Sequence, residues 1–114
     1  MKAWLLLGLA LLGVACTPQG GGGTQTPCPA VIDIPSFSYN PSDCTATAGS
    51  KVRFKNSDDV PHGAVTKASA PGAFDTGNLA SGATSAEIAL EVPGTYEHIC
   101  TAHGSSMGGQ IIVK

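Results

Sequence analysis

The chain has 114 residues, which allows one domain of modest size. Its formal net charge of -2 gives no support for a nucleic-acid partner or a polybasic membrane patch. The 15 glycines and 8 prolines, together with only 5% aromatic residues, favour short strands and turns over long helices.

Residues 1–15 are predicted to be a secretory signal peptide. One lysine precedes an apolar run from Ala3 to Leu12, which is too short to anchor the chain across a bilayer. The run ends in LGVAC, which resembles a bacterial lipobox whose cysteine, here Cys16, becomes the lipidated first residue of the mature protein. The alternative is an ordinary signal peptide in which Cys16 is incidental.

Residues 16–27 are rich in glycine and are predicted to form a flexible tether between the lipidated Cys16 and a domain that covers residues 28–114. A multiply acylated cysteine would anchor the chain firmly, whereas a single acyl chain binds membranes only weakly. We therefore expect an exported protein, held by its lipid on the periplasmic or cell-surface side of a bacterial membrane.

The cysteines of the domain have two predicted roles. Export implies an oxidising compartment, in which paired cysteines persist as disulfides. Cys28 and Cys44 are the natural pair, because their bond would pin the start of the domain to its second strand. Cys100 is then left over, and a lone cysteine in an exported domain needs a reason. The alternative is a bond from Cys100 to Cys28 or Cys44, which leaves another cysteine unpaired.

Alternating apolar residues predict strands along the domain. Residues 31–39 indicate one strand with a break at Pro35, and in residues 51–55 the alternation places Val52 and Phe54 on the buried face. The remaining predicted strands are 86–92, with Ile88, Leu90 and Val92 on one face, then 95–100 and 110–114. About eight short strands with glycine and proline between them predict an all-β, Greek-key β-sandwich.

The segment CTAHGSSM, which begins at Cys100, gathers a thiol, an imidazole and a thioether. Cys100 ends a predicted strand, and His103 and Met107 lie on the loop that leads to the last one. His62 follows a turn, at a position where a ligand from a distant part of the chain can enter. His98 is on the same face as Cys100 but about 6.6 Å away, which favours a buried or edge histidine over a ligand.

Two imidazoles and one thiolate with a distant thioether are the donor set of a blue copper site. Thiolate and thioether favour Cu(I) and imidazole serves both Cu(I) and Cu(II), so fast one-electron exchange is expected. Zinc can use the same atoms, but structural zinc sites more often have four thiolates, or two thiolates with two imidazoles. The alternative is that the candidate ligands are ordinary surface and core residues that bind no metal. The residues predicted to bind a single copper ion are His62, Cys100, His103 and Met107.

The domain from about Val31 to Lys114 resembles a small cupredoxin of the plastocyanin, amicyanin and pseudoazurin group. The motifs that carry the resemblance are PH at 61–62, FDTGNL at 74–79, PGTY at 93–96, and CTAHGSSM at 100–107 followed by GGQIIV. The resemblance implies an eight-stranded β-sandwich with one copper near one end. It also implies that Met107 is the axial ligand and that the other three predicted ligands are equatorial.

Three features depart from the family's pattern. Gly63 stands where the family commonly has Asn, whose side chain ties the two ligand loops together. Ala102 stands where Pro is frequent, so its backbone N–H is free to donate to the Cys100 sulfur and raise the reduction potential. Three residues separate His103 from Met107, between the two of amicyanin and the four of plastocyanin.

The function that follows is electron transfer without catalysis. We expect a monomer whose His103 is the port for the electron, with an apolar face that docks redox proteins such as a cytochrome or a membrane oxidoreductase transiently. Asp58 and Asp59 could steer a basic partner, although two acids in a turn are more often only solvated. The residues expected around His103 are Pro61, Ala64, Ala102 and Gly104.

The sequence gives less support to two other functions. A lipid-tethered copper chaperone or storage protein needs labile ligands or many methionines and histidines. This chain has only 2 methionines and 3 histidines. A copper enzyme needs further histidines for a second centre, and only His98 is spare.

Overall fold

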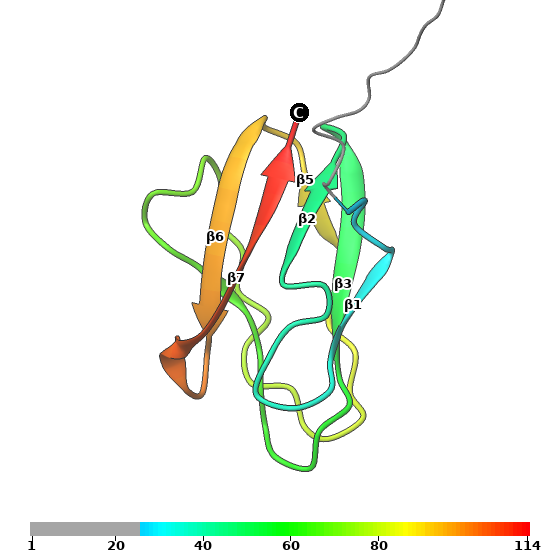
Figure 1. Cartoon of the computed structure of the whole chain (residues 1–114), viewed down its shortest axis with the longest axis vertical. Helices are drawn as coiled ribbons and strands as arrows, with labels where there is room; N and C mark the ends of the chain where they lie inside the picture. The colour runs from blue at the N-terminus through cyan, green and yellow to red at the C-terminus, as the bar shows by residue number, and fades with distance from the viewer. Residues whose placement is uncertain (1–25) are drawn as a thin grey trace, which may run out of the picture.

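The computed structural model describes residues 26–114, so the predicted signal peptide, Cys16 and most of the predicted tether lie outside the described residues. All regular secondary structure in the described range is β-strand (Figure 1). The same range contains no helix long and apolar enough to cross a membrane. The strands are β1 (Val31–Ile34), β2 (Asp43–Ala46), β3 (Ser50–Asn56), β4 (Val65–Thr66), β5 (Ile88–Leu90), β6 (Gly94–Cys100) and β7 (Gly104–Val113).

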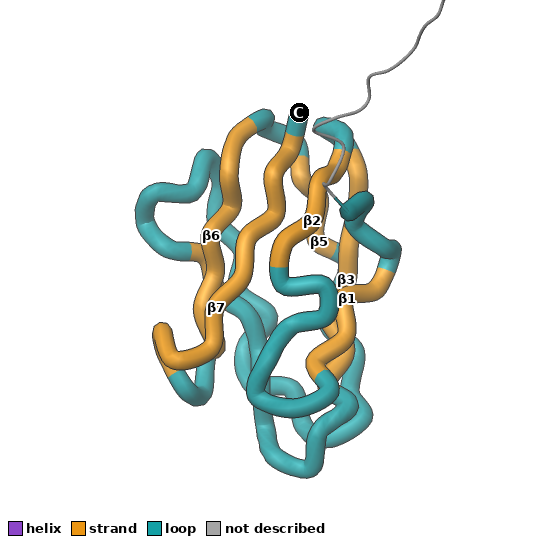
Figure 2. The backbone as a smooth tube through the Cα atoms, viewed as in Figure 1, coloured by secondary structure: helices purple, strands orange, loops and turns teal. Residues whose placement is uncertain are grey.

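The strands form two sheets, one with the order β1-β3-β5 and one with the order β2-β7-β6-β4. The pairs β1–β3 and β2–β7 are parallel, and the other pairs are antiparallel. Figure 2 shows the two layers of strands, with the longer loops gathered at the end opposite the C-terminus. The predicted all-β sandwich is therefore confirmed, with seven strands in the described residues instead of about eight.

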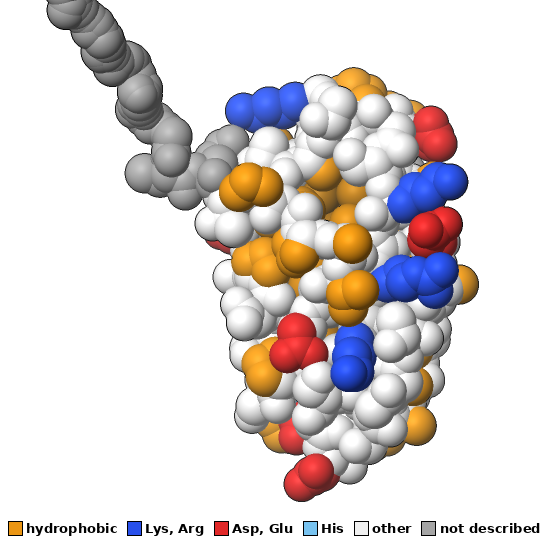
Figure 3. All heavy atoms as spheres, turned by 90° about the vertical axis from the view of Figure 1, so that its right-hand side faces the viewer, with side chains coloured by type: hydrophobic (Ala, Val, Ile, Leu, Met, Phe, Trp, Pro, Cys, Tyr) orange, Lys and Arg blue, Asp and Glu red, His pale blue; other side chains and the backbone are white. Residues whose placement is uncertain are grey.

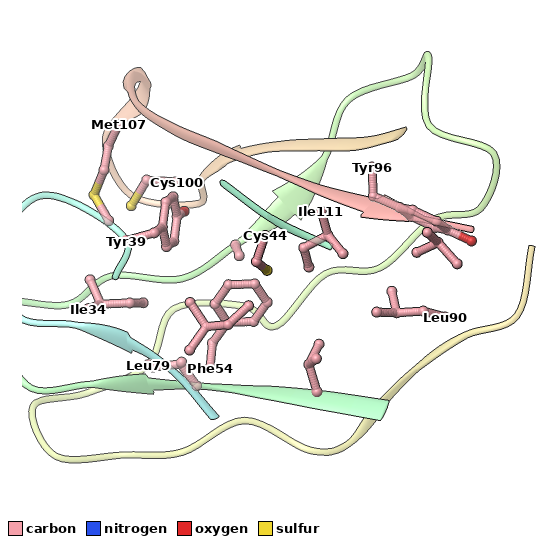
Figure 4. Packing of buried hydrophobic residues seen from close by; sticks show 14 residues of the cluster. Ile34, Tyr39, Cys44, Phe54, Leu79, Leu90, Tyr96, Cys100, Met107 and Ile111 are labelled. Carbon is pink, nitrogen blue, oxygen red and sulfur yellow. The ribbon is translucent and has the colours of Figure 1, made fainter. Parts of the chain in front are cut away.

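The core lies between the two sheets (Figure 4). Alternation along β3 buries Val52, Phe54 and Asn56 and exposes the residues between them, as expected for a strand with one face on the core. The Phe54 ring is fully buried, and its centroid lies 5.7 Å from that of Tyr39 and 5.4 Å from that of His98. The prediction for Val52 and Phe54 is confirmed.

Residues 35–39 do not continue the first strand. β1 ends at Ile34, and Asn40 returns to form an antiparallel bridge with Asp33. Pro35 has no backbone N–H for a ladder, so the chain leaves the sheet there. The prediction of one broken strand over 31–39 is therefore wrong for residues 35–39. They form a loop, which lies at the same end of the sandwich as His62.

Two other strand boundaries differ from the prediction. β5 ends at Leu90, and Val92 lies outside it with its side chain 48% exposed, so Val92 does not share the buried face. β7 begins at Gly104 instead of residue 110, because β6 and β7 pair along nearly their whole length and form a hairpin. Met107 therefore lies in a strand, and only Thr101–His103 remains as a turn.

Cys28 and Cys44 form the predicted disulfide, with 4.8 Å between their Cα atoms. Cys44 lies in β2, and the Cys28 N–H donates to the Thr45 carbonyl at 2.9 Å. Cys100 is free and buried. The bond therefore pins the start of the domain to its second strand, and the alternative bonds to Cys100 are excluded in this structure.

Candidate metal centre

Three of the predicted ligands come together at one end of the sandwich. The Cys100 sulfur lies 3.8 Å from His62 Nδ1 and 3.5 Å from His103 Nδ1. One ligand atom from each of the three residues falls within 4.8 Å of the others. Cys100 is the last residue of β6, and His103 follows in the turn to β7. His62 is 38 residues from Cys100 in sequence, so the fold itself assembles this cluster.

The backbone around His62 is held on two sides. His62 exchanges hydrogen bonds with Leu79, with its N–H donating at 3.2 Å and its carbonyl accepting at 2.6 Å. The buried Asn56 side chain donates to the carbonyls of Val60 and Leu79, both at 2.8 Å, and accepts from the Asp58 N–H at 2.9 Å. The amide of Asn56 therefore fixes the turn that delivers His62 to the site.

The environment of the Cys100 sulfur favours a thiolate. Burial alone would raise the pKa of the thiol, but hydrogen bonds from the Gly63 N–H, the two histidines and the Ala102 N–H lower it to about 6. A thiolate is the form of cysteine that binds metals. The Ala102 N–H can donate to the sulfur because no proline stands at that position.

Gly63 lies at the centre of this network. Its N–H donates to the Cys100 sulfur, and its carbonyl accepts from the Tyr39 hydroxyl at 2.6 Å. Tyr39 is buried, and this burial raises the pKa of its hydroxyl well above the usual value. A β-carbon on Gly63 would lie 2.2 Å from the Gly77 carbonyl oxygen and 2.4 Å from Thr101 Oγ1. The space of a side chain is therefore already filled.

The tie between the two ligand loops comes from other residues. Thr101, next to Cys100, donates from its hydroxyl to the Asn78 side-chain oxygen at 2.5 Å. Asn78 precedes Leu79, which pairs with His62. Gly63 has no side chain with which to make this tie, and the Thr101–Asn78 hydrogen bond joins the two loops in its place.

Met107 is 2% exposed and belongs to the buried apolar cluster. Figure 4 places its sulfur at the same end of the core as the Cys100 sulfur. Its place in β7, which pairs with β6, brings it back to that end. The thioether is thus available near the three-residue cluster as a fourth and weaker donor.

His98 is 2% exposed and packs among aromatic rings, with centroids 4.8 Å from Tyr39 and 5.8 Å from Phe74. Its Nδ1 lies 3.2 Å from the Tyr96 carbonyl oxygen. Burial is the main reason why its pKa falls below the usual value. The expectation of a buried histidine outside the ligand cluster is confirmed.

Two residues at the site were not found by sequence reasoning. Phe37, in the loop after β1, is 54% exposed, and its ring lies edge-on to both His62 and His103 with centroids 4.8 Å away. Asp58 Oδ2 lies 2.7 Å from His62 Nε2, although the sequence suggested only a solvated or steering acid. Neither residue belongs to a motif, so only the folded chain reveals these contacts.

The hydrogen bonds shift the ionisation of the Asp58–His62 pair. The bond from His62, followed by the bond from the Asp59 N–H, lowers the pKa of Asp58. Burial alone would lower the pKa of His62, but the bonds to Asp58 and Cys100 raise it above its usual value. Asp58 is therefore favoured in its ionised form, with its carboxylate facing Nε2 of His62.

Fold and site together define a class of protein: a small β-sandwich with a metal site of one thiolate, two imidazoles and a nearby thioether. Soft sulfur donors combined with imidazole suit copper, and the set lacks the carboxylate and carbonyl oxygens that hard cations prefer. The residues present therefore fit a copper ion.

Comparison with known proteins gives the family. A model described as copper binding proteins of the plastocyanin/azurin family matches residues 26–114. The chain belongs to this family, the cupredoxins, and its cofactor is copper.

Three relatives illustrate the match. The major chloroplastic plastocyanin isoform of Arabidopsis thaliana is 33% identical over 89 residues, which cover 69% of this chain and 53% of that one. A reduced mutant of amicyanin has a TM-score of 0.67 at 24% identity over 74% of this chain and 80% of its own, and this likeness shows the fold alone. A copper-containing nitrite reductase from Thermus scotoductus has a TM-score of 0.68 at 28% identity, over 85% of this chain but 25% of its own. The chain spans about half the length of the curated plastocyanin that it matches.

Proposed function

We propose that the chain is a one-electron carrier with a single type 1 copper ion, held by His62, Cys100 and His103 with Met107 as a weaker axial ligand. The observation that carries the proposal is the convergence of three donor atoms within 4.8 Å, from two segments of the chain that are far apart in sequence. Copper supplies the one-electron redox chemistry when bound. The protein holds the thiolate and the two imidazoles in place, so that little has to move when an electron passes.

The burial of the donors favours electron transfer over copper handling. Cys100 is 2% exposed, His62 0% and Met107 2%. A chaperone or storage protein has to release its ion readily, whereas these side chains are enclosed by the core. The rate at which the protein gives up copper to a chelator tests this distinction. We expect this rate to be slow, and rapid transfer would favour a copper chaperone or storage protein.

His103 is the most accessible of the three cluster residues and is the proposed port for the electron. Pro61, Ala102 and Phe37 are exposed, and Phe37 contacts the His103 ring. A small apolar surface of this kind suits weak and brief docking to a redox protein such as a cytochrome or a membrane oxidoreductase. Figure 3 shows one face of the molecule, on which acidic side chains lie at the lower end.

The proposed lipid anchor fits this arrangement. Pro27, at the start of the described chain, pairs with Thr45 in β2, and β2 pairs with the C-terminal half of β7. The tether would therefore join the domain away from the turn that carries His103. A chain acylated at Cys16, on the outer side of a bacterial membrane, would leave the copper end free for partners.

The decisive experiment adds Cu(II) to the metal-free chain from Thr17 onward and records its visible spectrum. We expect an intense blue band that disappears on reduction and in Cys100→Ser, because the colour requires a bond from thiolate to copper. A pale adduct in the unaltered protein would contradict the proposal.

Ala102→Pro is expected to lower the reduction potential of the copper-loaded protein. The substitution removes the N–H that donates to the Cys100 sulfur, and this bond stabilises the reduced state because it reduces the electron density on the thiolate. Voltammetry measures the change, which is about 59 mV for each tenfold change in the ratio of Cu(II) to Cu(I) affinity. Ala102→Gly keeps the N–H and serves as the control. If the reduction potential of Ala102→Pro were unchanged, the Ala102 N–H would not be stabilising the reduced state.

A further inference from the structure

The turn before His62 places a carboxylate against the nitrogen of that ring which faces away from the metal site. His62 Nδ1 lies 3.8 Å from the Cys100 sulfur, and His62 Nε2 lies 2.7 Å from Asp58 Oδ2. The His62 side chain is 0% exposed and that of Asp58 is 17% exposed. The ring is thus held between the thiolate on one side and the carboxylate on the other.

The Asp58 carboxylate is itself fixed by the fold. The Asp59 N–H donates to Asp58 Oδ1 at 2.7 Å, and the Phe37 N–H also donates to this carboxylate. The Asp58 N–H donates to the buried Asn56 side chain at 2.9 Å. Hydrogen bonds within its own turn and from the loop that holds Phe37 therefore orient Asp58, unlike an exposed ion pair that samples many geometries.

We propose that Asp58 is a positioning residue for the copper centre, acting through His62. Its carboxylate accepts the Nε2 proton of His62, so the lone pair of Nδ1 is presented to the metal. A carboxylate on the outer nitrogen of a ligand histidine fixes the ring and makes it a stronger donor. The negative charge also favours Cu(II) over Cu(I), because it stabilises the ion with the higher charge. This inference rests on the proposed function for the identity of the metal.

The consequence is measurable in binding and in potential. Removing such a carboxylate typically weakens metal binding by about 10–100-fold. Cu(II) binding should weaken more than Cu(I) binding, so the reduction potential should rise. Each tenfold change in the ratio of the two affinities corresponds to about 59 mV for a one-electron couple.

The chain offers a matched control in Asp59, an exposed acid next to Asp58. Asp58→Asn and Asp59→Asn each remove one negative charge from the same turn, but only Asp58 contacts the His62 ring. We expect Asp58→Asn to raise the potential by at least one tenfold step in affinity ratio and Asp59→Asn to raise it much less. Asp58→Glu keeps the charge and should recover part of the shift. Equal shifts in both Asn variants would overturn the proposal, because they would show only a general charge effect.

Two further measurements keep the test independent of copper chemistry and of folding in the variants. Zn(II) affinity, from competition with a chelator, should fall about 10–100-fold in Asp58→Asn and stay nearly unchanged in Asp59→Asn. Nitrogen NMR of the Zn(II)-loaded unaltered protein should show His62 protonated at Nε2. A proton on Nδ1, or an unchanged Zn(II) affinity, would refute the role of Asp58. The proposed function fails separately, if the unaltered protein gives no blue band with Cu(II).

Discussion

Gly63→Ala is expected to damage both the stability and the metal site, although it adds a single methyl group. The new β-carbon would lie 2.2 Å from the Gly77 carbonyl oxygen, 2.4 Å from Thr101 Oγ1 and 2.8 Å from Thr76 Oγ1. The first of these atoms belongs to the backbone and cannot rotate away. Thr76 is held as well, because its hydroxyl accepts from the Ala64 N–H at 2.9 Å.

The substitution would push apart the loops that carry His62 and Cys100. Overpacking of this kind costs about 1–3 kcal/mol of unfolding free energy. The shift also lengthens the hydrogen bond from the Gly63 N–H to the Cys100 sulfur, so copper affinity should fall about 10–100-fold, as for other supporting contacts of metal ligands.

Urea unfolding of the metal-free protein and competition for Cu(II) with a chelator measure the two effects. Gly72→Ala is the control, because its β-carbon would meet only the Tyr96 side chain at ordinary contact distances, 3.5 Å from a ring carbon and 3.6 Å from the hydroxyl oxygen. If Gly63→Ala were as stable and bound copper as tightly as Gly72→Ala, the close packing around Gly63 would not constrain the site.

The case of Gly63 shows what the sequence could and could not predict about the site. The residue was identified as a departure from the family's pattern, which removes the Asn that ties the ligand loops together. The structure shows a different solution, in which Thr101 and Asn78 make the tie. The space of the missing side chain is filled by Gly77, Thr101 and Thr76. Comparing position 63 alone with the family's pattern cannot reveal this compensation, because Asn78 and Thr101 lie 23 residues apart in sequence.

The metal-binding cluster could be predicted from the sequence because most of its donor side chains lie close together in the chain. A thiol, an imidazole and a thioether within eight residues leave few alternative interpretations, and His62 was the one suitable histidine outside that segment. Phe37 and Asp58 carry no such signal. Phe37 reaches the site only because the chain leaves the sheet at Pro35, and alternation of apolar residues suggested a strand there instead.

The strand pattern was predicted well where both the alternation and the pairing are long. β3 and β6 have seven residues each, and in both strands every second residue is buried, although two of the buried residues, Asn56 and His98, are polar. β5 has three residues, and Val92 continues its alternation in sequence but lies outside the sheet. Periodicity does not show where a partner strand ends, so the exposure of Val92 could not be predicted from it.

Replacing both Cys28 and Cys44 by Ser is expected to give the largest loss of stability. The disulfide joins residues 16 apart in sequence and fixes the start of the domain to β2, an edge strand of the four-stranded sheet. In the chain-entropy model a loop of this size contributes about 3 kcal/mol, and removal of native disulfides from small exported domains costs about 2–5 kcal/mol. A loss of about 3 kcal/mol corresponds to a Tm lower by roughly 12–24 °C in a domain of this size.

The same double variant should keep the blue copper spectrum at temperatures where it is folded. Cys44 pairs with Ile111 in β7, several residues beyond Met107, so the bond lies away from the metal cluster. Cys100→Ser provides the reciprocal control, because it should abolish the colour while the disulfide stays intact. Thermal unfolding and visible spectra of the two variants therefore separate the two roles of cysteine. If the double variant lost its colour while still folded, the disulfide would also be shaping the site, and the assignment of Cys28 and Cys44 to stability alone would be wrong.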